Sequence, residues 1–223
     1  MLIAEISNQH EGNLIKAKAL IRMAYNSGAD IVKAQAFKAE DFKTGTMPKS
    51  FYQKCEFNLE EYIELVDFAR GLGIDMFYSV LSESLFPLNN YCKYQKITAF
   101  QSDGYSFDKI RSMDKEEYII SFRNQFFKSS VLKKSKCLIA NDYLEDWNPE
   151  YIKEALRYNP NFGISDHSYG VDSLLNLLRH FNFPVIEKHF YLGDQIIKDF
   201  TVYRDCIHAA SPAEFMRLAK AIK

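Results

Sequence analysis

The chain has 223 residues, of which 47% are hydrophobic, and its formal net charge is −1 at pH 7. This size and composition suffice for a full hydrophobic core. The balanced charge, without basic blocks, argues against nucleic acid and anionic membranes as partners. No apolar run approaches the roughly 20 residues of a membrane span. The chain opens on a strand-like segment at residues 2–6 without a signal peptide, so we expect a cytoplasmic protein.

Eight short apolar runs have the character of buried strands, and helical periods lie between most of them. The predicted strands are residues 2–6, 31–35, 75–80, 94–98, 118–121, 136–140, 162–165 and 185–189. Two of the connecting segments, 82–91 and 122–135, have a poor helical period. The stretch from Lys38 to Asn58 shows no regular pattern, and we expect a long irregular loop there.

Helix boundaries are marked by capping residues. Gly28 follows an apolar stripe that begins at Ala17, and Gly71 or Gly73 follows a second stripe from Tyr62 to Ala69. Asn148-Pro149 predicts one helix start. The segment 171–181 carries another apolar stripe. Ser211-Pro212-Ala213-Glu214 is a capping box that begins the last helix.

Strands that alternate with helices indicate parallel pairing. Eight such strands close a (β/α)8 TIM barrel, and we expect one such domain over residues 1–223. An open doubly wound sheet is the rival fold. That fold favours a Gly-rich phosphate loop after the first strand, and residues 8–12 do not form one.

Charged and polar residues interrupt several predicted strands near their C-terminal ends. They are Glu5, Lys33, Gln35, Lys96, Glu187 and His189. Buried parallel strands normally have continuous apolar sequences, and the active site of a TIM barrel lies at the C-terminal ends of its strands. A single such charge is readily explained by a structural ion pair, whereas several at the same end favour a site. Two lysines there suit a phosphate and a carboxylate.

Two strings close the last two strands, Ser165-Asp166-His167 and Glu187-Lys188-His189. Neighbouring parallel strands would bring His167 and His189 together. Two neutral imidazoles with a carboxylate suit Mn²⁺, Zn²⁺, Co²⁺ or Fe²⁺ better than Mg²⁺. His10 follows the first strand and is a candidate substrate contact. His180 at a helix end has a structural interpretation, and the role of His208 stays open.

Four motifs in order resemble the sialic acid synthases, which are the N-acetylneuraminate, legionaminate and pseudaminate synthases. The motifs are Ala4-Glu5-Ile6 with His10-Glu11-Gly12, Gly28 to Gln35, Gly163 to Ser168, and Ile186 to Phe190. They run from the first strand to the last and cover nearly the whole chain. The resemblance implies a TIM barrel that condenses phosphoenolpyruvate with an N-acetylated hexose such as N-acetylmannosamine. The products would be a nonulosonic acid and phosphate, formed with cleavage of the C–O bond of phosphoenolpyruvate.

The resemblance also implies roles for individual residues. It makes His167 and His189 ligands of Mn²⁺, with Mg²⁺, Co²⁺ and Zn²⁺ as alternatives, and it places Glu5 near the metal-bound water and the aldehyde. The implied phosphoenolpyruvate contacts are Lys33, Lys96, Ser121, Asn141 and Ser165, and the implied sugar contacts are Gln35, Tyr143 and Asp199. A homodimer is a further implication.

The chain departs from the family pattern at several positions. Val80 and Ala99 stand where hydroxyl donors are expected, and Phe100 and Phe122 add bulk where the family has small residues. Arg123 is a candidate replacement for the lost phosphate donors. The sequence ends at Lys223, where the family continues into a small antifreeze-like domain, so we expect the catalytic barrel without it.

Two other functions stay open. One is a metal-dependent lyase or aldolase that acts on another phosphorylated or keto-acid substrate. The other is a non-catalytic homologue that binds a sugar or phosphate in surface-glycan biosynthesis. The retained Glu5, Lys33, Lys96, His167 and His189 favour an enzyme, whereas the altered strand ends favour the alternatives.

Overall fold

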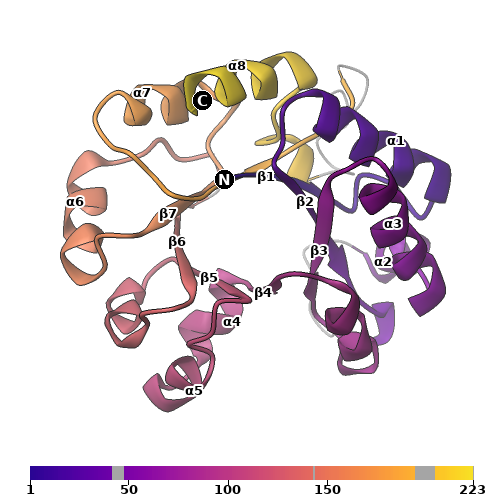
Figure 1. Ribbon diagram of the computed structural model, residues 1–223, viewed down its shortest axis with the longest axis horizontal. Coiled ribbons are helices and arrows are strands. Elements are labelled where there is room, and N and C mark those ends of the chain that lie inside the picture. Colours follow the sequence, from indigo (N-terminus) through magenta and orange to yellow (C-terminus); the bar gives the residue numbers. More distant parts are fainter. Residues whose placement is uncertain (42–47, 143, 194–203, 223) are drawn as a thin grey trace.

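The structure is a computed structural model that describes residues 1–41, 48–142, 144–193 and 204–222. Its strands form a closed ring in the order of the sequence, from β1 to β8, and every neighbouring pair is parallel. Figure 1 shows this ring with the helices arranged around it. The strands are β1 Leu2–Ser7, β2 Ile31–Ala36, β3 Asp75–Val80, β4 Gln95–Ile97, β5 Tyr118–Phe122, β6 Lys136–Ala140, β7 Gly163–Asp166 and β8 Ile186–His189. The TIM barrel is confirmed, and the open doubly wound sheet is excluded.

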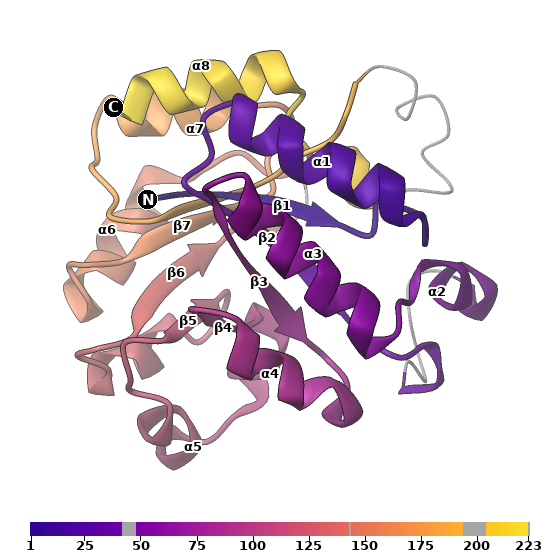
Figure 2. The same ribbon diagram turned by 45° about the vertical axis from the view of Figure 1, so that its right-hand side comes forward.

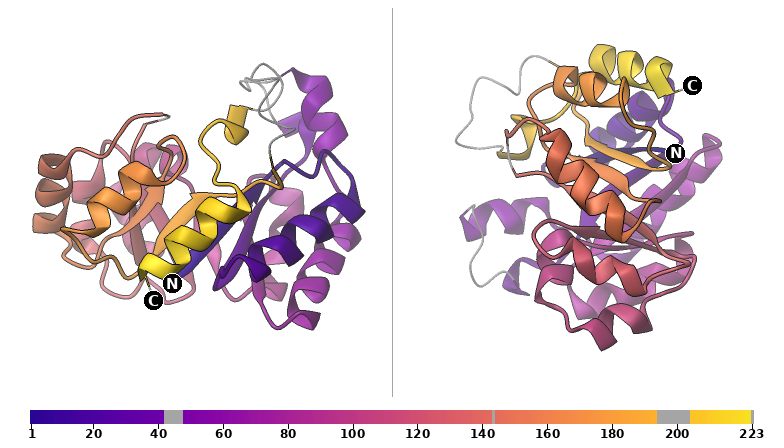
Figure 3. Two further views of the ribbon diagram at one scale, coloured as in Figure 1. Left: turned by 90° about the horizontal axis from the view of Figure 1, so that it is seen from above. Right: turned by 90° about the vertical axis from the view of Figure 1, so that its left-hand side faces the viewer.

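The helices follow the predicted stripes and caps. They are α1 Leu14–Asn26, α2 Lys49–Cys55, α3 Leu59–Gly71, α4 Ala99–Gly104, α5 Phe107–Ser112, α6 Pro149–Tyr158, α7 Asp172–Leu178 and α8 Pro212–Ile222. Helix α6 begins at the predicted Asn148-Pro149 pair, and Ser211 and Glu214 make the predicted capping box before α8. Figure 2 shows α1 and α3 side by side on the outside of β1–β3, and Figure 3 shows α7 beside α8.

The structure also contains four short 3₁₀ helices. They are η1 Ala39–Asp41, η2 Glu83–Tyr91, η3 Phe126–Val131 and η4 Arg204–Cys206. Of these, η2 and η3 occupy the two segments with a poor helical period, 82–91 and 122–135. A 3₁₀ helix has about three residues per turn, so its buried positions do not recur at the α-helical spacing. The irregular loop expected between Lys38 and Asn58 is partly wrong, because η1 and α2 lie within it. Phe37, Ala39, Tyr52 and Cys55 form a small core there, which packs η1 and α2 together.

The hydrophobic core has two parts, which follow from the alternation of side chains along each strand. The larger part fills the space between the strands and the helices. The smaller part fills the barrel at the N-terminal ends of its strands and consists of Ile3, Ile31, Phe77, Ile119, Leu138 and Val185. Gly163 has a special place, because a Cβ on this residue would lie 2.2 Å from the carbonyl oxygen of Val185. A glycine is therefore required for the close approach of β7 and β8.

The four cysteines Cys55, Cys92, Cys137 and Cys206 are free thiols. Among the helices that the structure describes, none is both long and apolar enough to cross a membrane.

Candidate active site

A band of polar side chains lies inside the barrel above the apolar layer. Most of its members stand two residues after a member of that layer and therefore point inward, whereas Lys96 pairs with Ile119 of the layer and Ser165 pairs with Glu187 of the band. The band contains Glu5, Lys33, Ser79, Lys96, Ser121, Ser165 and Glu187, all of them buried. Seven inward polar groups on seven strands are far more than a structural ion pair requires.

Four charged side chains of this band form a connected network. The Glu187 carboxylate accepts Lys96 Nζ at 2.8 Å and lies 3.3 Å from Lys33 Nζ. Lys33 also makes an ion pair with Glu5, its register partner on β1. Two ammonium groups thus face two carboxylates. Such a balanced network lets buried charges persist, because each has an opposite neighbour.

The two carboxylates of the network differ in proton affinity. Burial would raise the pKa of Glu187, but Lys33 and Lys96 outweigh it and lower the pKa to about 2. Burial raises the pKa of Glu5 to about 7, against the opposing effect of Lys33 and with a contribution from the negative charge of Glu187. Glu187 is therefore a fixed anion, whereas Glu5 can exchange a proton near neutral pH.

The two lysines also differ. Burial lowers the pKa of Lys33, but the carboxylates of Glu187 and Glu5 more than offset this, and the net pKa is raised. Burial lowers the pKa of Lys96 to about 8, and the attraction of Glu187 offsets this only in part. Lys33 therefore stays protonated at neutral pH, whereas the pKa of Lys96 lies only slightly above neutral pH.

The backbone at the end of β1 holds Glu5 in place. Ser7 has φ of 47°, in the left-handed region that costs a non-glycine residue about 1 kcal/mol or more. This turn brings the Ser7 amide back to the Glu5 side chain, to which it donates a hydrogen bond of 2.6 Å. Local strain at this point therefore fixes the orientation of a buried carboxylate.

Hydroxyl groups surround the charged network. Lys33 donates to Ser79 Oγ at 3.2 Å, and Ser165 Oγ donates to Glu187 at 3.1 Å. Ser121 Oγ is buried and has no hydrogen-bond partner among the described residues. A buried hydroxyl without a partner costs free energy, and an anionic ligand in the barrel would supply an acceptor for it.

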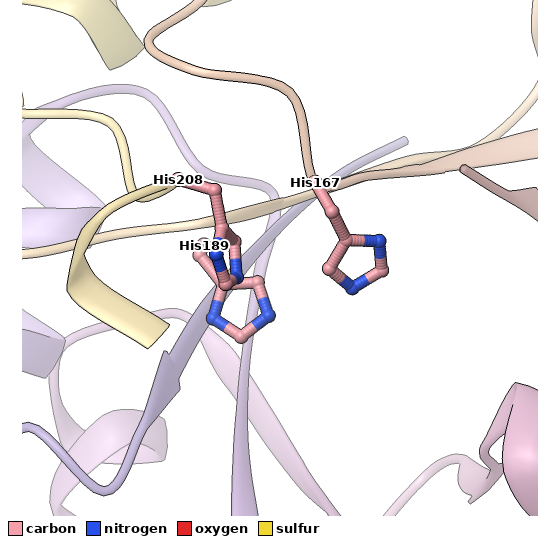
Figure 4. Close-up of side chains that lie close together, drawn as sticks. All are labelled: His167, His189 and His208. Atoms are coloured by element: carbon pink, nitrogen blue, oxygen red, sulfur yellow. The ribbon is translucent and has the colours of Figure 1, made fainter. Parts of the chain in front are cut away.

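Three buried histidines gather at the same end of the barrel. His167 follows β7, His189 ends β8, and His208 follows η4. Each offers a nitrogen, and these three nitrogens lie within 4.8 Å of one another. The ring centroids of His167 and His189 are 5.4 Å apart, and those of His189 and His208 are 4.4 Å apart. Figure 4 shows the three rings gathered at one place.

Burial keeps the imidazoles of His167 and His189 neutral. It lowers the pKa of His167 to about 4, and it lowers that of His189 well below the usual value, with a smaller effect from the neighbouring His208. Neutral imidazole is the form that binds metal ions.

The backbone and outer side of β7 and β8 position the two strand histidines. Asn141 Oδ1 accepts the backbone N–H of His167 at 2.8 Å. On the outer face, Lys188 makes a fully buried ion pair with Asp166 and donates to the Ser168 carbonyl at 2.7 Å. Asp166 also accepts the indole N–H of Trp147. The residues Asp166 and Lys188 thus join the two strands next to their histidines.

The structure describes nine of the eleven predicted site residues. Glu5, Lys33, Lys96, Ser121 and Ser165 lie in the inward band, and Gln35, Asn141, His167 and His189 lie at the C-terminal ends of their strands. Gln35 accepts a hydrogen bond from Asn8 at 3.0 Å. Tyr143 and Asp199 lie outside the described residues.

Some positions beyond the predicted site differ from expectation. Phe122 does not add bulk to the mouth, because it points outward, where it is fully buried against Phe162. Phe100 is 92% exposed at the start of α4. Arg123 makes an ion pair with Asp142, with 3.1 Å between Nε and Oδ1. His10 is buried, with its ring stacked on Phe57 at 4.5 Å, which favours a structural role.

Three residues of the site, Ser79, Glu187 and His208, were not among the predicted site residues. Glu187 has a clear sequence signal, since it stands two residues before His189 and therefore shares its face. His208 has no such signal, because it lies outside the predicted strands and helices, well after the end of the last strand.

Comparison with known proteins gives the family. Residues 20–122 match the model of the NeuB family. An uncharacterized protein of Methanocaldococcus jannaschii is 34% identical over 241 aligned residues, which cover 100% of this chain and 69% of that protein. The chain belongs to the sialic acid synthase family, NeuB.

Other similar proteins have names that state a function. The pseudaminic acid synthase of Campylobacter jejuni subsp. jejuni serotype O:23/36 is 27% identical over 254 residues, which cover 96% of this chain and 73% of that protein. A crystal structure of an N-acetylneuraminic acid (sialic acid) synthetase from Leptospira borgpetersenii superposes with a TM-score of 0.78 at 20% identity, over 99% of this chain and 81% of the other. The similarity to this crystal structure shows a shared fold.

The histidine cluster fits a divalent metal ion, the cofactor that sialic acid synthase membership implies. It offers several neutral nitrogen donors within reach of one ion. Nδ1 of His189 is buried and has no hydrogen-bond partner among the described residues. A buried donor atom of this kind is satisfied when it binds a metal.

Proposed function

We propose that this protein condenses phosphoenolpyruvate with the open-chain aldehyde of an N-acetylated hexose similar to N-acetylmannosamine. Carbon 3 of phosphoenolpyruvate forms a bond to the aldehyde carbon, and water adds at carbon 2. The tetrahedral intermediate then loses inorganic phosphate by cleavage of its C–O bond, which leaves the keto group of a nonulosonic acid. The proton that the water gives up balances the proton that the new hydroxyl gains.

One observation carries the proposal. Two buried lysines and a cluster of neutral histidines share the C-terminal end of a barrel whose sequence belongs to the sialic acid synthase family. The lysines suit the anionic substrate and the histidines suit a metal for the carbonyl substrate. A single-substrate binding protein would need only one of these two groups.

The lysines account for recognition of phosphoenolpyruvate. Its carboxylate and phosphate can bind Lys33 on β2 and Lys96 on β4 alongside their present carboxylate neighbours, because both lysines point into the barrel. The hydroxyl of Ser121 then gains an acceptor, and Ser165 stays as a donor beside Glu187. Anion binding would thus satisfy the unpartnered hydroxyl of Ser121 and give the two lysines further anionic partners.

Glu5 accounts for the proton balance. With a pKa of about 7 it can take a proton from the water that adds at carbon 2 and return one to the oxygen of the former aldehyde. Its register with Lys33 on β2 and with His189 on β8 supports this role.

His167 and His189 would hold the metal ion, Mn²⁺ or a related divalent cation. Such an ion acts as a Lewis acid on the aldehyde oxygen. Asn141 helps to fix the backbone of His167, and Gln35 lies at the end of β2 as a sugar contact. Tyr143 and Asp199 stay predicted sugar contacts.

The experiment is inorganic phosphate release from phosphoenolpyruvate with Mn²⁺, in the presence and absence of N-acetylmannosamine and other N-acetyl sugars. Phosphoenolpyruvate labelled with ¹⁸O at its bridging oxygen distinguishes the bond that breaks, because C–O cleavage leaves the label in phosphate. We expect sugar-dependent release of labelled phosphate. The Lys96→Ala variant should lose this activity, and Lys153→Ala, a change at an exposed lysine, should keep it.

Three results would contradict the proposal. Released phosphate that lacks the ¹⁸O label would favour a lyase or aldolase. Release that requires a carbonyl acceptor other than an N-acetyl sugar would favour the same alternative. No release with any sugar, in folded and metal-loaded protein, would favour a non-catalytic binding role.

A further inference from the structure

His208 lies close enough to the two strand histidines to share a ligand with them. Its ring centroid is 5.3 Å from that of His167 and 4.4 Å from that of His189, and its side chain is 1% exposed. Figure 4 shows its ring beside that of His189. The predicted metal site has two histidines, whereas the structure brings three to the same place.

Backbone hydrogen bonds fix the segment that carries His208. Ala210 donates its N–H to the carbonyl of His189 at 2.7 Å, and Tyr191 donates to the carbonyl of Ala210 at 3.1 Å. Phe190 and Ala210 thereby form a parallel bridge that extends β8. His208 stands two residues before this bridge, so its position is tied directly to that of His189.

A second tether holds the other side of the segment. Ser7 Oγ donates to the Asp205 carboxylate at 2.6 Å, which joins the segment to the end of β1. Cys206 is buried between this contact and His208. Two tethers on either side of one residue preorganise its side chain, and a metal ligand needs such preorganisation.

A purely structural role for His208 is the alternative. The ring of His208 meets that of His189 edge to face, with an interplanar angle of 83°, which is a favourable aromatic contact. A Phe or Tyr would make this contact without burying a second polar nitrogen. Three imidazoles that all present nitrogens to one small space are better explained by a common ligand than by ring packing.

We propose that His208 is a third protein ligand of the metal ion, which is therefore held by three imidazole groups. The proposal rests on the proposed function only in placing a metal between His167 and His189. An all-nitrogen set of three donors raises the affinity for Co²⁺ and Zn²⁺ relative to Mn²⁺ and Mg²⁺. Three protein ligands still leave coordination for a substrate oxygen, as in other catalytic sites with three protein ligands.

The test uses Co²⁺ bound to the metal-free full chain and is independent of enzyme activity. We expect a 1:1 complex with visible absorption bands in the unaltered protein. His208→Ala should weaken Co²⁺ binding by about 100-fold or more, since loss of groups that only support a ligand already costs 10- to 100-fold. The matched control is His180→Ala, because His180 is an exposed histidine near the end of α7.

A second variant separates ligation from structural support. In His208→Cys, kept reduced, a thiolate bound to Co²⁺ gives a sulfur-to-metal charge-transfer band in the near ultraviolet. Because the chain also carries native free thiols, Cys206 among them, the band counts only where the unaltered protein with Co²⁺ lacks it. A band found only in His208→Cys supports the proposal even if His208→Ala is poorly folded. Unchanged Co²⁺ affinity in folded His208→Ala, or Co²⁺ binding by His208→Cys without the band, would overturn it.

The outcomes for metal binding and for the reaction are distinguishable. Co²⁺ binding that depends on His208, without phosphate release from phosphoenolpyruvate, supports the three-histidine site and refutes the proposed reaction. Phosphate release with a Co²⁺ affinity that does not depend on His208 supports the reaction and refutes the third ligand.

Discussion

Among the single residues of the site, Lys96 gives the protein a pH dependence. Its pKa in the free protein is lowered to about 8, chiefly by burial. Above this pH the ammonium loses its proton, whereas the phosphate of phosphoenolpyruvate stays ionised. We therefore expect the affinity for phosphoenolpyruvate to fall by up to about tenfold per pH unit above pH 8.

The measurement is the dissociation constant of phosphoenolpyruvate by calorimetry between pH 6.5 and 9.5. Lys96→Arg keeps its charge over this range, so its affinity should not change near pH 8. The same decline in both proteins would assign the pH dependence to a different group.

His189 is the second residue for which a single substitution gives a clear prediction, here for metal binding. Its ring is buried in the histidine cluster, and its removal takes one nitrogen donor from the site. His189→Ala should lose Mn²⁺ binding in equilibrium dialysis while its circular dichroism spectrum stays that of a folded barrel. His180→Ala is the control and should bind Mn²⁺ normally. Retained Mn²⁺ affinity in folded His189→Ala would remove His189 from the site.

At the level of the elements, contacts on the outer face of β7 and β8 hold together the two strands that carry His167 and His189. The Asp166–Lys188 ion pair is fully buried, and Asp166 also binds Trp147 and Ser168. Replacing one partner of a buried pair leaves an uncompensated charge and typically costs 3–5 kcal/mol. Lys188→Met should therefore lower the free energy of unfolding by about that amount.

Urea denaturation measures this loss. The control is Lys153→Met, which removes an exposed ion pair with Glu150 and should cost less than about 1 kcal/mol. Similar midpoints for Lys188→Met and the unaltered protein would show that the pair adds no stability to these strands.

The elements also show what sequence patterns can predict. All eight strands are found close to their predicted positions, because apolar runs with inward charges at a spacing of two identify both the strand and its inner face. Lys33 with Gln35 and Glu187 with His189 are examples. The segments 83–91 and 126–131 escaped prediction because a 3₁₀ helix has no α-helical period.

The site residues at strand ends could be predicted from the sequence as well as the strands themselves. His167 and His189 end neighbouring strands, so parallel pairing alone brings them together. His208 reaches them through backbone bonds between residue 210 and the end of β8, and these bonds have no counterpart in local sequence. Phe122 was misplaced because its side faces the helices, whereas the neighbouring Ser121 faces the barrel.

At the scale of the whole molecule, the barrel is closed by the pairing of β1 with β8. The proposed metal ligands His167 and His189 stand at the C-terminal ends of β7 and β8, and the segment that carries His208 is attached to β8 and β1. A bound ion would therefore join parts of the chain that are far apart in the sequence, next to the closing strands. The homodimer stays a prediction, since a single chain is described.

Metal binding should accordingly stabilise the folded barrel. An ion at 100 times its dissociation constant adds about 2.7 kcal/mol, and for a domain of this size each kcal/mol raises Tm by about 2–4 °C. We expect an increase of about 5–10 °C when Co²⁺ or Zn²⁺ is added to metal-free protein at that excess. His189→Ala should show no increase. Calorimetry at several metal concentrations checks this, because a specific site gives an increase that grows with the logarithm of free metal. An unchanged Tm, in protein that binds the ion by dialysis, would mean that the ion binds the unfolded chain equally well and that the histidines are not a site formed by the fold.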